Sequence, residues 1–442
     1  MKSRKRKTII MLSTCLAVSL TLFGCSEKKA VNENASAAES STDKITLTIG
    51  HYDVDKNGEI FREALQEFRD ENKNINLVEE AVPHDAYRVK MTTLGASGEL
   101  PDLFVANGSM LIDYIPKGYV GTLNEALDAD PAWRDGFLPN SFDEFTVDGN
   151  IYGVPTAMFT VHMIYYNKKL FQQAGISEFP KTWDGFTDAI EKLKAIGVTP
   201  IAMGNKSNVP VGSTIFSTLA DRFTGTEWFH EMKAGKAKFT DAEFVSALTQ
   251  LQDLAKMGAF NPDINSIDPS QARTLYFNKQ AAMIIDGAWA VTDITRDGPE
   301  DIEKSTGLAS LPPVPGGKGD PLAVAGGSGW SVAYNAKLTG AEKEAAIKLL
   351  KKVSNEEYGR KKIERNGQPP VKVTDYDKSK LAPLSVEYFQ FMEGKKFTPI
   401  YDIQLNPALV EVIYKGIQDL LIGGIQPADL AKKIQTIQDS QQ

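Results

Sequence analysis

The chain has 442 residues, of which 42% are hydrophobic and 24% charged, and its formal net charge at pH 7 is −8. This composition is typical of a globular chain that is long enough for two domains of ordinary size. The excess of acidic side chains disfavours binding to nucleic acid or to anionic surfaces, because both attract basic proteins.

The first segment is basic and then apolar, which is the order found in export signals. Five basic residues among the first seven precede an apolar stretch from Thr8 to Phe23. The stretch ends in Leu22-Phe23-Gly24-Cys25, which resembles the lipobox of bacterial lipoproteins. We therefore expect residues 1–24 to be a lipoprotein signal peptide and Cys25 to be acylated, so that the protein is anchored on the extracytoplasmic face of the cell membrane. An uncleaved signal anchor with an incidental cysteine is the alternative.

The segment after Cys25 is expected to be a tether. Residues 25–43 are rich in Ser, Ala, Asn, Glu and Lys and contain no aromatic side chain. Such a segment cannot bury enough apolar surface to fold, so it is expected to be flexible.

From residue 45 onward, strand and helix patterns alternate. Residues 45–49 alternate apolar and polar side chains and predict the first strand, and 74–78 and 101–106 predict the next two. Helical spacing predicts helices between them. Further helices are expected at 183–196, 243–256, 339–353, 406–423 and 427–437. Strands alternating with helices predict an α/β fold with parallel strands and a ligand site beyond their carboxyl ends.

Several short segments resemble, in the same order, those of the family 1 extracellular solute-binding proteins, the maltose-binding type that serves carbohydrate ABC importers. They are Pro101–Phe104, Tyr152–Pro155, Tyr165–Phe171, Ala174–Gly175, Pro180–Trp183, Phe277–Met283, Asp286–Trp289 and Gly326–Trp330. The resemblance implies a two-lobed periplasmic-binding-protein fold of type II-like topology. Each lobe would hold a mainly parallel sheet flanked by helices.

The resemblance also implies that the chain crosses between the lobes three times. The first lobe would contain residues 44–155 plus 329–365, and the second lobe 156–328 plus 366–442. The crossings would lie near Pro155–Phe159, Ala325–Gly329 and Asn366–Pro370. Glycine and proline near these segments are consistent with a few backbone torsions absorbing a hinge motion.

A sugar presents apolar ring faces and a rim of hydroxyls, so its site needs aromatic and planar polar side chains. Trp289 matches the stacking aromatic of the family, although a tryptophan after Gly-Ala could instead fill the core. Asp53 follows the first strand, and its carboxylate could accept from two hydroxyls. His51 and Tyr52 stand where the family often has an aromatic, so either could stack, or Tyr52 could belong to the core.

The remaining candidates come from the other strand ends and crossings. Asn107 and Ser109 follow the third strand, and Ser109 could alternatively cap a helix. The glycine-rich second crossing contributes Gly327, Ser328 and Trp330, where the glycine permits close approach of the backbone to a ligand. Trp330 could be either a wall of the site or part of the core. The weaker candidates are Phe159, Asn205 and Gln368, the last of which could equally be a turn residue.

The sequence lacks the residues that other kinds of functional site require. Asp53–Gly58 imitates the start of an EF-hand, but the twelfth position is Ala64 where a bidentate Glu is required. The segment 326–330 fails the Gly-x-Ser-x-Gly elbow at its last position, and the four histidines show no metal spacing. No Gly-x-x-x-x-Gly-Lys-Ser/Thr motif is present, so a partner would have to supply ATP hydrolysis. We expect no catalysis, no metal and no cofactor.

The function expected from these observations is capture of a mono- or oligosaccharide by hinge closure. The protein would act as a monomer and would deliver its ligand to the transmembrane subunits of an ABC permease. One alternative is a ligand sensor for a membrane receptor, whose sequence could look the same. Another is a surface glycosidase or lyase, because the many acidic residues could include a catalytic pair.

Overall fold

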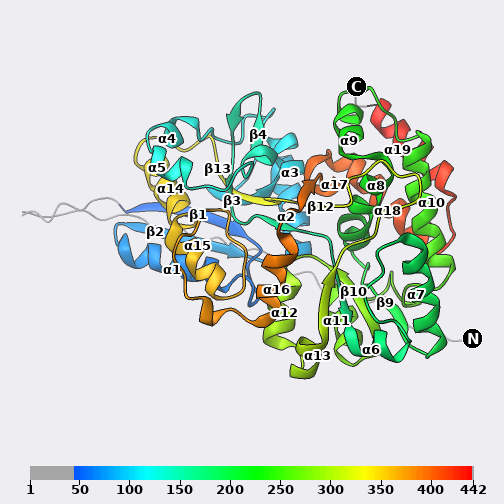
Figure 1. Ribbon diagram of the computed structural model, residues 1–442. Helices are drawn as coiled ribbons and strands as arrows, with labels where there is room; N and C mark the ends of the chain where they lie inside the picture. Colours follow the sequence, from blue (N-terminus) through cyan, green and yellow to red (C-terminus); the bar gives the residue numbers. More distant parts are fainter. Residues whose placement is uncertain (1–43, 441–442) are drawn as a thin grey trace, which may run out of the picture. The chain divides into compact units, whose positions relative to one another are not determined.

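The structure of the protein is a computed structural model that describes residues 44–440. The expected signal peptide 1–24 and the tether 25–43 with Cys25 lie outside the described residues. Strands and helices are interspersed along the described chain, as Figure 1 shows. They alternate singly over residues 45–114, and later strands or helices also follow one another in runs. Within this part of the chain, every helix is too short or too polar to cross a bilayer.

The first sheet has the strand order β2-β1-β3-β13-β6. Its strands are β1 (Ile45–His51), β2 (Ile75–Ala81), β3 (Leu103–Asn107), β6 (Val154–Pro155) and β13 (Trp330–Tyr334). β1 pairs in parallel with β2 and β3, whereas β13 runs antiparallel to β3 and β6. β13 therefore begins at the edge where β1 and β3 end, and we call the first sheet with its helices the first lobe.

Helices bury one apolar face each against the first sheet. Those of the first lobe are α1 (Glu59–Glu71), α2 (His84–Ser97), α3 (Gly108–Tyr114), α4 (Asn124–Asp128), α5 (Pro131–Asp135), α14 (Gly340–Lys352) and α15 (Glu356–Glu364), with the 3-10 turn η1 (Asp143–Phe145) and the hairpin β4 (Thr146–Val147) and β5 (Asn150–Ile151). In α1 the buried residues recur at three- and four-residue spacing, from Ile60 to Phe68. This is the helical spacing that the sequence predicts.

The second sheet has the strand order β11-β8-β10-β9. Its strands are β8 (Met163–Asn167), β9 (Thr199–Ala202), β10 (Ala281–Asp286) and β11 (Thr306–Ala309). Only β9 and β10 are parallel, because β8 runs antiparallel to both β10 and β11. Each sheet is thus mixed rather than mainly parallel, since the chain re-enters it in the opposite direction. We call the second sheet with its helices the second lobe.

The second lobe has the larger set of helices. They are α6 (Lys168–Gln173), α7 (Trp183–Ala195), the π-helix η2 (Val211–Phe216), α8 (Ser217–Thr224), α9 (Thr226–Lys233), α10 (Ala242–Lys256), α11 (Pro269–Phe277), α12 (Trp289–Asp297), α13 (Glu300–Ser305), the 3-10 turn η3 (Lys378–Lys380), α16 (Pro383–Met392), α17 (Tyr401–Gln404), α18 (Pro407–Leu421) and α19 (Pro427–Asp439). Thr182 caps α7 by accepting from the Gly185 amide at 3.2 Å. Proline follows the caps of α18 and α19, as the sequence predicts.

A small third sheet lies on the route between the lobes. It has the order β14-β12-β7, with β7 (Phe159–Thr160), β12 (Ala323–Gly327) and β14 (Lys396–Thr398). β6 leads to β7 through residues 156–158, and β12 leads to β13 through 328–329. Further along, Val371 still bridges to Phe137 and packs in the core of the first lobe. Leu384 of α16 packs in a core of the second lobe.

Candidate functional site

Aromatic rings gather at the edge of the first sheet where β1 and β3 end. Trp330, the first residue of β13, pairs with Asn107, the last residue of β3. Tyr52 directly follows β1, and its ring centroid lies 4.9 Å from that of Trp330. His84, at the start of α2, lies 5.0 Å from Tyr52 and 5.3 Å from Trp330. We call Tyr52, His84 and Trp330 the edge cluster.

Asp53 lies beside the edge cluster with its carboxylate uncommitted. Its backbone amide donates to Nδ1 of His51 at 3.1 Å, but among residues 44–440 no hydrogen bond to its carboxylate is found. Burial raises the pKa of Asp53, and the charges of His51 and Lys362 oppose this rise. Lys362 donates from Nζ to the carbonyl of Thr156 at 2.7 Å, and burial lowers its pKa to about 8. The Asp53 carboxylate therefore offers a hydrogen-bond acceptor and the Lys362 ammonium group a donor, both in partly desolvated surroundings.

The second lobe contributes another aromatic pair. Trp289 begins α12 and is half-buried, and its ring meets that of Phe159 nearly at right angles with centroids 5.7 Å apart. The side chain of Trp289 also hydrogen-bonds Asp286, the last residue of β10. Burial raises the pKa of Asp286, and Arg273 opposes this with Nη1 at 3.5 Å from the carboxylate. An apolar face and a carboxylate therefore stand together at the end of β10.

A hollow of about 280 Å³ opens beside Asp286, at the carboxyl ends of β9 and β10. Ala202 and Met203 line it at the end of β9, and Thr214 of η2 lines another side. Such π-helical turns occur frequently at functional sites. The hollow occupies the position where an α/β sheet is expected to bind its ligand.

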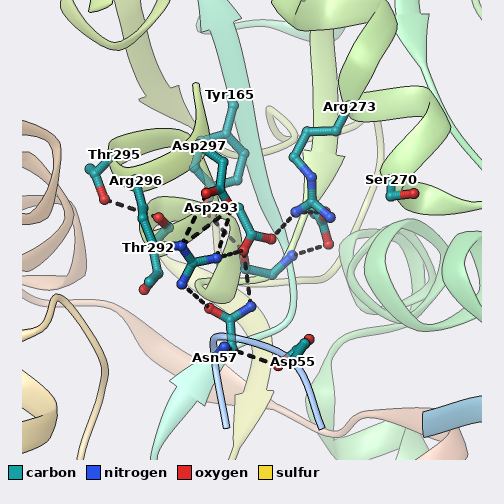
Figure 2. A network of polar contacts seen from close by, with 12 residues as sticks. Asp55, Asn57, Tyr165, Ser270, Arg273, Thr292, Asp293, Thr295, Arg296 and Asp297 are labelled. Carbon is teal, nitrogen blue, oxygen red and sulfur yellow. Dashed lines mark hydrogen bonds and ion pairs between the residues drawn. The ribbon is translucent and has the colours of Figure 1, made fainter. Parts of the chain in front are cut away.

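The two lobes touch through the loop that follows Asp53. Figure 2 shows Asn57 of this loop against α12, where its Nδ2 donates to Asp293 at 2.9 Å. Arg296 contacts both Asn57 and Asp293, and Arg273 also pairs with Asp293. Lys56 forms an ion pair of 2.8 Å with Asp297. We call the contacts of Lys56 and Asn57 with α12 the latch.

A second contact between the lobes is buried. Arg88 of α2 pairs with Asp402 of α17 at 3.3 Å, and Asp402 is 4% exposed. Tyr414 donates to the same carboxylate at 3.0 Å, and Arg88 lies over the ring of Trp330 at 5.8 Å from its centroid. The edge cluster is thereby connected to the second lobe.

Three of the predicted site residues have their polar atoms committed within the protein. His51 is fully buried, with Nε2 at 3.0 Å from Glu79 and Nδ1 accepting the Asp53 amide. Ser328 donates to the carbonyl of Ser141 at 2.6 Å. The Asn205 side chain, also fully buried, is held by the Val211 amide and by Asn265. Their hydrogen bonds hold these three side chains against other parts of the protein.

Other predicted residues take intermediate positions. Asn107 caps α3, since its Oδ1 accepts the Met110 amide at 2.9 Å, while its Nδ2 has no hydrogen-bond partner among the described residues. Ser109 is therefore not the cap, and it is 4% exposed inside α3. Gly327 has φ 152°, and a Cβ there would come within 2.3 Å of a Glu144 oxygen. Gln368 is half-buried, and among the described residues its side chain hydrogen-bonds only the nearby carbonyl of Asn366, at 3.4 Å.

Several residues near the cleft were missed in the sequence. His84 and Arg88 share one face of α2, which directly follows β2 at the same sheet edge as Tyr52. Their four-residue spacing after a predicted strand was a usable signal. Lys362 and Glu144 carry no such signal, because each reaches the crossings from an element distant in sequence.

The family of the chain follows from a match over residues 53–360 to the bacterial extracellular solute-binding proteins. The chain belongs to this family. Its fold is that of a two-lobed solute-binding protein.

Curated relatives resemble the chain over part of their length. A putative binding protein of Brucella abortus is 25% identical over 64% of this chain and 66% of its own length, slightly under two thirds. An uncharacterized ABC transporter extracellular-binding protein of Pyrococcus horikoshii is 24% identical over 69% of this chain and 70% of its own length. A probable sugar-binding periplasmic protein of Mesorhizobium japonicum is 26% identical over 47% of this chain and 48% of its own.

Solved structures resemble the chain over nearly their full length. A chitin oligosaccharide binding protein has a TM-score of 0.83 and 30% identity, covering 90% of this chain and 99% of that one. A protein described with xylan utilization by the thermophilic Caldanaerobius polysaccharolyticus has a TM-score of 0.81 and 27% identity, covering 89% of this chain and 100% of that one. The two-lobed fold is thus shared along the described chain.

Proposed function

We propose that this protein captures a mono- or oligosaccharide between its lobes and presents it to the transmembrane subunits of an ABC importer. The observation that carries the proposal is an aromatic cluster in each lobe, the edge cluster in the first and Trp289 with Phe159 in the second. Aromatic faces bind the apolar faces of sugar rings, and the uncommitted Asp53 carboxylate accepts hydroxyls. The names of its relatives, sugar-binding and ABC transporter proteins, support the same function.

The ligand site within this cleft comprises a subset of the predicted residues. We assign ligand contact to Trp289, Phe159, Tyr52 and Asp53, which supply ring faces and an acceptor. Trp330 is 7% exposed and packs in the core of the first lobe, so it supports Tyr52 from behind. Asn107, Ser109, Gly327 and Gln368 form the floor and the hinge around them. The protein binds without catalysis, in keeping with relatives and structural neighbours that are named as binding proteins.

Hinge closure would move two lobes whose residue ranges can be assigned. We place residues 44–155 and 329–373 in the first lobe, and 156–328 and 374–440 in the second. The first lobe extends beyond residue 365 because Val371 packs in its core. Since only a difference in affinity between two conformations can shift their populations, the sugar must contact both lobes to favour the closed form.

The location outside the cytoplasm follows from the family, and the anchor is a further proposal. An extracellular solute-binding protein works outside the cytoplasmic membrane. We propose that Cys25 carries the lipid and that the protein acts as a monomer above the membrane. Mass spectrometry of the membrane-bound protein tests the first point, because an unmodified Cys25 would contradict it.

The decisive experiment measures sugar binding by the purified protein and its Trp289→Ala variant. Isothermal titration against mono- and oligosaccharides should find a ligand, and the variant should lose at least ten-fold in affinity because a stacking face is removed. The unfolding temperature without sugar should change little, since Trp289 is only half-buried. Equal affinity in the variant would contradict its role, and no binding of any sugar would contradict the function.

A further inference from the structure

The hollow beside Asp286 is too small for an oligosaccharide. Its volume of about 280 Å³ includes the open space at its mouth, and pockets for drug-sized ligands begin at roughly 300 Å³. It lies at the ends of β9 and β10, and Trp289 begins the helix that follows β10. It therefore suits one substituent of a sugar whose ring lies outside.

The walls of the hollow are mostly apolar. Ala202, Met203, Ala272, Ile284 and Ile285 all line it, and none has a side chain that donates or accepts a conventional hydrogen bond. A hydroxyl pushed against these walls would give up hydrogen bonds to water without replacement. A methyl group there would gain van der Waals contact and would give up no hydrogen bond to water. The hollow therefore selects an apolar group.

Two polar side chains line this apolar space, Thr214 and Asp286. The Thr214 hydroxyl donates to the Pro210 carbonyl at 2.8 Å, so Asp286 is the acceptor considered for a ligand. Asp286 lines the hollow and is 8% exposed, and its Oδ1 accepts the Gly287 amide at 2.9 Å. A carboxylate has about four acceptor positions and donates nothing when ionised, so it can accept one more N–H. The ligand group should thus combine an N–H with an apolar end.

We propose that the hollow holds the acylamino substituent of an amino sugar. The substituent's N–H would donate to Asp286, and its methyl group would contact Ala202, Ala272 and Ile284. The inference depends on the proposed sugar-binding function and narrows its ligand class. A sugar with a hydroxyl at the same position would leave the apolar walls unfilled. A sugar with a free ammonium group there would bring a charge against those walls.

The test compares matched oligosaccharides in titrations of the purified full-length protein. The probes are β-1,4-linked oligomers of N-acetylglucosamine, glucosamine and glucose of equal length. We expect the acetylated oligomer to bind at least ten-fold more tightly than the other two. Equal binding of all three, or tighter binding of glucose oligomers, would overturn this inference while leaving the sugar-binding function intact. No binding by these or by any other sugar would contradict both.

Two variants locate the preference in the hollow. Ala272→Leu fills it and should reduce the preference for the acetylated oligomer at least five-fold, whereas Ala336→Leu, at an exposed position, should not. If Ala272→Leu does not fold, Asp286→Asn serves instead, because its amide presents one acceptor in place of two. An unchanged preference in a folded variant of either kind would overturn the assignment.

Discussion

Asp53 and Glu144 are half-buried carboxyl groups of the first lobe, but their surroundings give them different roles. The Asp53 carboxylate lacks a hydrogen-bond donor among the described residues, whereas Glu144 accepts the Gly329 amide at 2.6 Å and Gln404 at 3.4 Å. Asp53 is therefore available to a ligand. Glu144 instead holds the second crossing, since Gly329 lies between β12 and β13.

Glu144 should make stability depend on pH. Burial raises its pKa to about 7, while the Gly329 amide, Gln404 and the nearby Asp143 and Asp402 modify this effect. Because the folded-state pKa exceeds the unfolded value, its stabilising contribution is complete below about pH 4.5 and is lost as pH rises through 7. Glu144→Gln should therefore be more stable than the native protein at pH 8, by on the order of 2–3 kcal/mol.

Urea unfolding between pH 5 and pH 8 measures this difference. Glu144→Gln should gain over the native protein as pH rises. The control Glu227→Gln, at an exposed position, should show no such trend. A gain for Glu144→Gln that is the same at both pH values would contradict the role of burial.

At the scale of elements, the loop after β1 belongs to the first lobe and the helix α12 belongs to the second. The two elements are in contact where the lobes touch. The latch joins them by Lys56 to Asp297 at 2.8 Å and by Asn57 to Asp293 at 2.9 Å. Asp293 also pairs with Arg273 and Arg296 of its own lobe. These pairs hold its carboxylate in position before the lobes close. Such a contact favours the closed arrangement without touching the ligand.

Removal of the latch should speed release of the sugar. A Lys56→Ala and Asn57→Ala double variant should lower affinity by roughly two- to ten-fold, because partly exposed polar pairs each contribute about 0.2–1 kcal/mol. Stopped-flow dissociation should show the change mainly as a faster off-rate.

The control for the latch is Lys73→Ala. It breaks a 2.9 Å ion pair with Asp70 within one lobe, so it should leave release unchanged. A double variant that releases sugar at the native rate would show that the latch does not hold the closed form.

At the scale of the whole molecule, the lobes have separate hydrophobic cores. Between them lies a small cluster of Val161, Ala325, Ile400 and Ile403. A sugar held by both lobes adds a connection that the unfolded chain lacks. Its binding must stabilise the folded state by mass action, by about 2.7 kcal/mol at a hundred times the dissociation constant.

Differential scanning calorimetry tests whether the ligand contacts both lobes. A saturating sugar should shift the whole unfolding transition upward and narrow it, because both cores then unfold together. If only part of the transition shifted, the ligand would contact a single lobe and closure by the sugar would be excluded.

The sequence by itself determined the local elements. Helical spacing predicted α1, α7 and α18, and the strand pattern predicted β1, which Tyr52 and Asp53 directly follow, because spacing and caps are short-range signals. Only the tertiary structure decided that His51 and Ser328 turn inward, that the sheets are mixed, and that Lys362 and Arg88 reach the cleft. These facts depend on contacts between residues far apart in the chain, which local pattern does not encode.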